Sequence, residues 1–286
     1  MNQNPQREVE AVLAADNIHS RLKDATNPVL ADNRPMVGLV LGTGWGDAVE
    51  LHDSTQIPFE DIPGFEALGT LEGHRRVLEI GYLDDLRARP PVAILRGRVH
   101  MNEDPLDPAV PRMVRLQIAM LCELGVRKLV LTCAAGSLTD KYQVGDVVGI
   151  RNFVSFGNEM MPLWAGEFVS PEDVLDEEWC RATAPAAKSL KLRYWDDGAY
   201  AYFRGPHFEG RARDKLNLYE LGANVVGMSV KPECCVAALY GARAMGVAFV
   251  TNDAVAEHSH EQNVARAKAE SPKLGAFLRE VVAHLS

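Results

Sequence analysis

Residues 36–46 read MVGLVLGTGWG, an apolar run that ends in three alternating glycines. Residues 36–41 are apolar on both faces, as expected of a buried strand. Glycines directly after such a strand let backbone N–H groups turn toward an anion, and Thr43 adds a hydroxyl donor. Asp47 replaces the third glycine of the dinucleotide-binding pattern and no Gly-Lys-Ser/Thr follows, so neither a dinucleotide loop nor a P-loop is indicated. A tight glycine turn that binds nothing explains the pattern equally well.

Beyond this segment, short apolar runs alternate with longer helical patterns. This alternation predicts an α/β domain with a largely parallel sheet, whose sites form beyond the carboxyl ends of its strands. An i, i+3, i+4, i+7 apolar pattern at 274–285 predicts an amphipathic helix. The predicted strands are 36–41, 77–83, 92–96, 128–132, 146–150, 199–203, 224–228 and 247–251, and the other predicted helices are 111–124, 209–221 and 232–245.

The composition excludes several classes of protein. With 286 residues, 47% apolar and 24% charged, the chain can bury a sizeable core. Its net charge of −9 argues against non-specific binding to nucleic acid or to an anionic membrane. No apolar run approaches the ~18 residues of a membrane span, and the polar start MNQNPQREVE is unlike a secretory signal.

Five cysteines, an odd number, include no pair with C-x-x-C spacing. A disulfide framework or a structural zinc site is therefore not indicated. We expect buried thiols in a reducing cytoplasm and assign them no catalytic role. They are Cys122, Cys133, Cys180, Cys234 and Cys235.

Two segments that follow predicted strands offer further donors to an anion. Arg98 and His100 share a face in an extended segment, and an arginine fork beside an imidazole suits phosphate. Glu103 could hold the other nitrogen of that imidazole. Ser229 could present its hydroxyl at a helix N-terminus. A solvated strand end and a plain helix N-cap are the alternatives. If this strand end is exposed, loss of Arg98 should weaken phosphate binding at least about tenfold and change stability little.

Other segments after predicted strands suit a planar ligand. Phe208 could stack on such a ligand, Glu209 could accept its N–H groups, and the Asn252 amide could donate to and accept from a heterocycle edge. The small residues at 133–138 would let a ligand lie against the backbone. Turn chemistry, a first-turn helix carboxylate and tight packing are the alternatives. Together with the anion donors, these residues suggest an inorganic anion held beside a hydrogen-bonding base.

The ordered set of motifs resembles the trimeric purine nucleoside phosphorylase family, which includes methylthioadenosine phosphorylases. This resemblance implies a single domain over 1–286 with a mixed, distorted central sheet, an N-terminal helical segment at 1–30, a C-terminal lid and helix at 257–286, and a homotrimer. The matching stretches are LGTGWG (41–46), IPGF (62–65), Gly73-His74, GRVH (97–100), CAAGSL (133–138), GPHFE (205–209), VGMS (226–229) with Pro232-Glu233, and VTND (250–253).

The resemblance also implies the reaction and the site. A cytoplasmic glycosyltransferase of this kind would split purine ribo- or deoxyribonucleosides with phosphate into free base and (deoxy)ribose 1-phosphate, for purine salvage. Oxopurines such as inosine and guanosine would be favoured, with phosphate as co-substrate, no cofactor or metal, and no nucleic-acid or membrane partner. Phosphate would bind Thr43, His74, Arg98, His100, Ser229 and the backbone of Ala134, the nucleoside would bind Phe208, Glu209, Met228, Asn252 and His260, and the catalytic residues would be Asn252, Glu209 and His100.

Four departures from the family pattern keep two other functions open. Asn102 stands where the family usually has an aromatic residue, Cys133 replaces an asparagine, Arg75 and Arg76 follow the Gly-His pair, and Lys231 adds a charge near the expected phosphate. A methylthioadenosine-type phosphorylase, or a divergent member that binds nucleosides with little turnover, remains an alternative.

Overall fold

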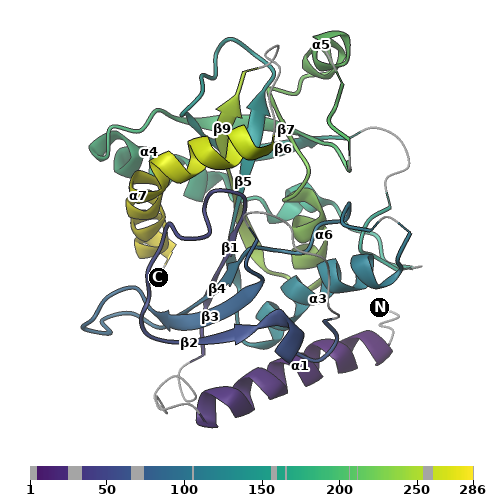
Figure 1. Cartoon of the computed structure of the whole chain (residues 1–286), viewed down its shortest axis with the longest axis vertical. Coiled ribbons are helices and arrows are strands. Elements are labelled where there is room, and N and C mark those ends of the chain that lie inside the picture. Colours follow the sequence, from purple (N-terminus) through teal and green to yellow (C-terminus); the bar gives the residue numbers. More distant parts are fainter. Residues whose placement is uncertain are drawn as a thin grey trace.

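The structure is a computed structural model that describes residues 5–24, 34–65, 74–104, 106–155, 160–164, 166–205, 207–210, 212–253 and 260–285, with side chains undescribed at 5–8 and 260–264. Nine strands form one central sheet (Figure 1). They are β1 (Val37–Leu41), β2 (His52–Pro58), β3 (Val77–Tyr82), β4 (Val92–Arg96), β5 (Lys128–Ser137), β6 (Val147–Val154), β7 (Tyr194–Tyr202), β8 (Val225–Gly227) and β9 (Arg243–Asn252).

The sheet has the order β2-β3-β4-β1-β5-β8-β7-β6-β9, and β5 also pairs with β9. Its parallel pairs are β1–β4, β1–β5, β5–β9, β6–β7 and β7–β8. Antiparallel pairing joins β2–β3, β3–β4, β5–β8 and β6–β9. The mixed sheet that the resemblance implied is confirmed. The alternation of strand and helix patterns had predicted a largely parallel sheet, which overestimates the fraction of parallel strand pairs.

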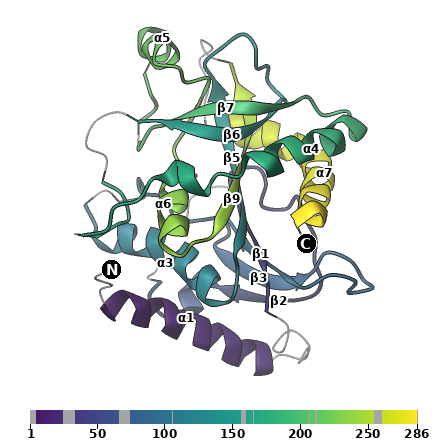
Figure 2. The same cartoon turned by 180° about the vertical axis from the view of Figure 1, so that it is seen from behind.

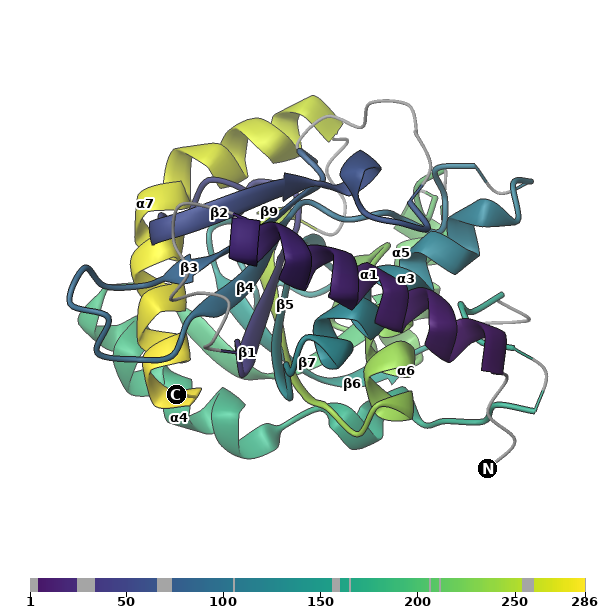
Figure 3. The ribbon, with the colours of Figure 1, turned by 90° about the horizontal axis from the view of Figure 1, so that it is seen from below.

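Helices cover both faces of the sheet, as Figures 1 and 2 show from opposite sides. Helices α1 (Pro5–Asp24), α3 (Ala109–Glu123) and α6 (Lys231–Leu239) pack on the face that carries Val40 and Leu95. Helices α4 (Glu177–Ser189) and α7 (His260–Leu285) pack on the face of Leu39 and Ile94. Figure 3 shows α1 and α7 on either side of the strands. The remaining elements are α5 (Ala212–Glu220) and two short 3-10 helices, η1 (Phe59–Asp61) and η2 (Pro171–Val174).

The predicted elements are present, although several strands are longer than predicted, among them β6, β7 and β9. Strand β5 continues to Ser137, so residues 133–137 belong to the strand and not to a loop after it. The helix predicted over 232–245 ends at Leu239, because Gly241 adopts a positive φ of 64° that stops a helix, and β9 begins at Arg243. Strand β2 and helix α4 were not predicted; β2 exposes most of its residues and lacks a buried apolar face.

The C-terminal helix α7 is confirmed and rests directly on the loop that follows β1. A Cβ at Gly44 would lie 1.9 Å from the Cβ of Ala267, and a Cβ at Gly275 would lie 1.7 Å from the carbonyl oxygen of Ala48. Gly44 also has a positive φ of 79°. Glycine at these two positions therefore allows the helix to reach the loop. Among the residues described, no helix has the length and apolar character to cross a membrane.

Candidate active site

A cavity of about 310 Å³ opens where β1, β5, β8 and β9 end. It brings together residues that are up to about 200 positions apart in the sequence. They include almost every site residue that was predicted from the sequence. Arg98 is not among the residues that line the cavity. The lining is Gly42, Thr43, His74, His100, Asn102, Cys133, Ala134, Ala135, Gly136, Phe208, Glu209, Val226, Gly227, Met228, Ser229, Thr251 and Asn252.

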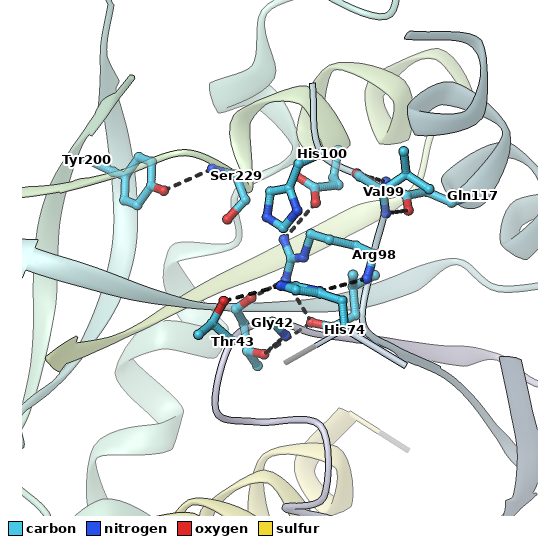
Figure 4. A network of polar contacts seen from close by, with 12 residues as sticks. Gly42, Thr43, His74, Arg98, Val99, His100, Gln117, Tyr200 and Ser229 are labelled. Carbon is cyan, nitrogen blue, oxygen red and sulfur yellow. Dashed lines mark hydrogen bonds and ion pairs between the residues drawn. The ribbon is translucent and has the colours of Figure 1, made fainter. Parts of the chain in front are cut away.

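Thr43 and His74 form a hydrogen-bonded pair at one end of the cavity (Figure 4). The backbone N–H of Arg98 donates to His74 Nδ1 at 3.1 Å, so that nitrogen carries no proton. His74 Nε2 therefore bears the ring proton and donates to Thr43 Oγ1, 3.2 Å away. Since Thr43 accepts in this bond, its own hydroxyl proton can be donated to an anion in the cavity.

Arg98 lies behind the cavity and not on its surface, which corrects the expectation of an exposed strand end. Its side chain is fully buried, and Nη1 donates to Glu233 Oε1 at 2.6 Å. Its Nη2 donates to the carbonyl oxygens of Val40, at 3.2 Å, and Thr132. A Cβ at Gly42 would come within 2.9 Å of Nη2, so the guanidinium lies directly against the backbone of a residue that lines the cavity.

Glu103 holds the backbone of His100 and not its ring. Its Oε1 accepts the His100 backbone N–H at 2.8 Å but lies 3.9 Å from His100 Nδ1, too far for a hydrogen bond. Glu103 Oε2 forms an ion pair with Arg76. Arg76, one of the two arginines that depart from the family pattern, therefore has a structural role. Burial raises the pKa of Glu103, and the bonds from His100 and Arg76 oppose that rise.

Ser229 is held by two neighbours that sequence reasoning did not connect to it. Its backbone N–H donates to the hydroxyl of Tyr200 at 3.2 Å. The side chains of Tyr200 and Ser229 lie beside the Cys133 thiol, which lines the cavity. The role of Tyr200 could not be predicted from the sequence, because a tyrosine within a strand pattern resembles an ordinary core residue.

Phe208 and Glu209 also line the cavity. Phe208 is half-exposed, whereas the Glu209 side chain is buried, with Lys215 Nζ 3.7 Å from its Oε1. Lys215 comes from α5 and is itself buried. Phe208 and Glu209 thus place a carboxylate acceptor beside a half-exposed aromatic ring. Lys215 was missed, since a lysine in a helix pattern usually lies in solvent.

Asn252 ends β9 and turns its amide across β5. The Thr251 hydroxyl donates to Asn252 Oδ1 at 3.2 Å, and Asn252 Nδ2 donates to the Asp253 carbonyl at 3.3 Å. A Cβ at Gly136 would lie 2.8 Å from Nδ2, so a glycine there makes room for the amide. Each amide atom keeps capacity for a further bond to a ligand.

Met228 and Asn102 form a shared part of the cavity wall, with Asn102 Nδ2 donating to Met228 Sδ at 3.6 Å. Lys231 does not line the cavity; its ammonium donates to Ser155 and lies 5.6 Å from the Tyr202 ring. The side chain of His260 lies outside the described residues.

The cysteine thiols should be unreactive in the native protein. All five are buried, and burial raises the pKa of Cys133 to about 12. At pH 8 about 10⁻⁴ of such a thiol is ionised, against about a tenth of a thiol with pKa 9, and the thiolate is the reactive form. We expect a disulfide reagent to titrate five thiols in denaturant and almost none natively within minutes; rapid native labelling would contradict this.

Comparisons with known proteins agree with this geometry. Residues 36–283 match the model of the phosphorylase superfamily. The chain is 34% identical over 253 residues to a purine nucleoside phosphorylase of Mycobacterium tuberculosis, covering 86% of this chain and 88% of the relative. It is 28% identical over 277 residues to the Bos taurus purine nucleoside phosphorylase, covering 89% and 90%. In fold it is similar to isoform 2 of the Schistosoma mansoni purine nucleoside phosphorylase, solved with cytosine and ribose-1-phosphate, with a TM-score of 0.80, 24% identity and 97% of each chain covered.

Proposed function

Because this chain belongs to the phosphorylase superfamily and to its purine nucleoside phosphorylases, we propose that it splits 6-oxopurine nucleosides with inorganic phosphate. The products are the free base and ribose or deoxyribose 1-phosphate, a reaction suited to purine salvage. One observation carries the proposal: a single cavity is lined both by the hydroxyl and imidazole groups of an anion site and by Glu209 and Asn252, which suit a purine.

At the anion end, Thr43, His74, His100, Ser229 and the backbone of Ala134 hold phosphate below the sugar. Arg98 adds positive charge from behind Gly42, although Glu233 neutralises part of it. As the C1′–N9 bond breaks, the sugar becomes oxocarbenium-like, and the anionic phosphate stabilises that charge. A phosphate oxygen then forms the new bond to C1′, so no protein nucleophile is needed.

At the base end, Phe208 packs on the purine and Met228 lies against the ribose, where His260 would contact the 5′-hydroxyl. The departing base gains electron density at N7, and the Asn252 amide can donate to it there. Glu209 accepts the N1–H of a 6-oxopurine. These bonds strengthen as the base leaves, which favours the transition state over the bound nucleoside.

By likeness to the family, we also propose a homotrimer. The reaction would use phosphate as co-substrate and need no cofactor. Nucleoside and phosphate are its binding partners, and the net charge of −9 disfavours nucleic acid.

Turnover should depend on phosphate. Inosine, guanosine, xanthosine, adenosine and methylthioadenosine are each incubated with and without phosphate, and base and sugar 1-phosphate are measured. We expect both products from inosine and guanosine only when phosphate is present, because phosphate is the attacking group. Equal base release in phosphate-free buffer would identify a hydrolase, and no release from any nucleoside would identify a binding protein; either would refute the proposal.

A further inference from the structure

Arg96, the last residue of β4, lies outside the cavity but binds the loop that carries Thr43. Its side chain is buried. Nη1 donates to the Gly46 carbonyl at 2.6 Å and Nη2 to the Val49 carbonyl at 2.7 Å. One planar guanidinium therefore fixes two carbonyls of the loop at a set separation.

The guanidinium is itself held from the sheet edge. Arg96 Nε pairs with Glu79 on β3, and both side chains are buried. The Ser54 hydroxyl of β2 donates to the other carboxylate oxygen of Glu79 at 2.5 Å. The chain of contacts runs from β2 through β3 and β4 into the loop, so the position of Arg96 is set by the sheet.

The other parts of the loop have their own anchors. Gly42 N–H donates to Thr132 Oγ1 at 3.0 Å, and the Trp45 indole donates to the Cys133 carbonyl at 3.1 Å. Thr43 thus lies between two anchors to β5, at Gly42 and Trp45, and Arg96 holds the part of the loop that follows from Gly46 onward. Without Arg96, the carbonyls of Gly46 and Val49 lose their donors and the far end of the loop gains freedom.

We infer that Arg96 is a positioning residue for phosphate. Arg96 acts through the backbone of the loop that carries Thr43. The inference rests on the proposed function, in which the Thr43 hydroxyl donates to phosphate. Misplacing a binding group by about 1 Å can cost on the order of 10²-fold in rate. The effect should fall on phosphate and spare the nucleoside, since Glu209 and Asn252 are carried by other elements.

The test is the double variant Arg96→Met with Glu79→Leu. Replacing both partners of a buried ion pair by apolar groups of similar size often preserves stability, whereas removing one leaves a buried charge. We expect the melting temperature to stay near that of the wild type, the phosphate KM and the calorimetric phosphate Kd to rise at least tenfold, and the nucleoside KM at saturating phosphate to stay within threefold.

Two further variants keep the test decisive. Arg127→Met is the matched control, because Arg127 also donates to two backbone carbonyls, of Cys122 and Val126, at 2.6 and 2.8 Å, but at the C-terminal end of α3 and not in the loop after β1. Its phosphate KM should stay within twofold. Arg96→Lys serves if the double variant does not fold; one ammonium cannot span both carbonyls, so we expect an intermediate rise.

A phosphate KM and Kd unchanged in the Arg96 variants, or both substrate KM values rising together, would overturn the inference. So would an equal effect of Arg127→Met. Failure of the proposed function is a separate outcome: the wild type would then bind phosphate without turnover, and the Kd series would still decide the role of Arg96.

Discussion

Arg98→Ala should destabilise the protein by about 3–5 kcal/mol, as expected when one partner of a buried ion pair is removed. The substitution leaves Glu233 as an uncompensated buried carboxylate, and the carbonyls of Val40 and Thr132 lose their donor. The free energy of unfolding from urea denaturation measures the loss. If Arg98 lay at an exposed strand end, as the sequence alone suggested, the free energy of unfolding would change little. The measurement therefore distinguishes a buried Arg98 from an exposed one.

The matched control for this prediction is the double variant Arg98→Met with Glu233→Leu. It removes both charges and retains most of the buried volume, so most of the lost stability should return. A loss below about 1 kcal/mol for Arg98→Ala would be the value of an exposed pair and would contradict the buried arrangement.

Inosine should be split at least about 10²-fold more efficiently than adenosine, measured as kcat/KM. The N1–H of inosine can donate to the Glu209 carboxylate, which Lys215 accompanies at 3.7 Å. The lone pair at N1 of adenosine would face that carboxylate, and the 6-amino group would face the Asn252 amide donor. Mismatched buried polar groups are costly, although amide rotation and bridging water reduce the discrimination.

Asn252→Asp should raise the ratio of adenosine to inosine efficiency at least about tenfold, because a carboxylate can accept from the 6-amino group. Asn102→Asp is the control, since it places the same charge in the cavity wall beside Met228 and not at the end of β9. An unchanged ratio in Asn252→Asp would show that Asn252 does not read the base. Wild-type preference for adenosine or methylthioadenosine would overturn the 6-oxopurine assignment.

The sequence predicted the residues of the site better than their supports. Thr43, Ser229 and Asn252 follow or end buried strands, and strand ends meet at one edge of such a sheet, so their convergence could be expected. Lys215 and Tyr200 lie inside regular elements, where a helix or strand pattern gives no sign of a distant partner. Their roles depend on contacts between elements that no local pattern encodes.

The limits of local reasoning are clearest at Arg98 and β2. Arginine after a strand usually reaches solvent, and only the approach of Glu233 from α6, 135 residues away, makes burial of the charge possible. Strand β2 has the burial pattern of a loop, because it is an edge strand that pairs on one side only with β3.

The contact between α7 and the loop after β1 constrains how this sequence can vary over evolutionary time. Gly44 and Gly275 each face a neighbour closer than 2 Å from any added Cβ, although Gly275 lies far from the cavity. An added methyl group at Gly275 would therefore move the helix, the loop and the Thr43 hydroxyl together. Residue 275 is therefore restricted to glycine, because the atom opposite it is a backbone carbonyl that no side-chain change at residue 48 can remove, and residue 44 is restricted both by Ala267 and by its positive φ.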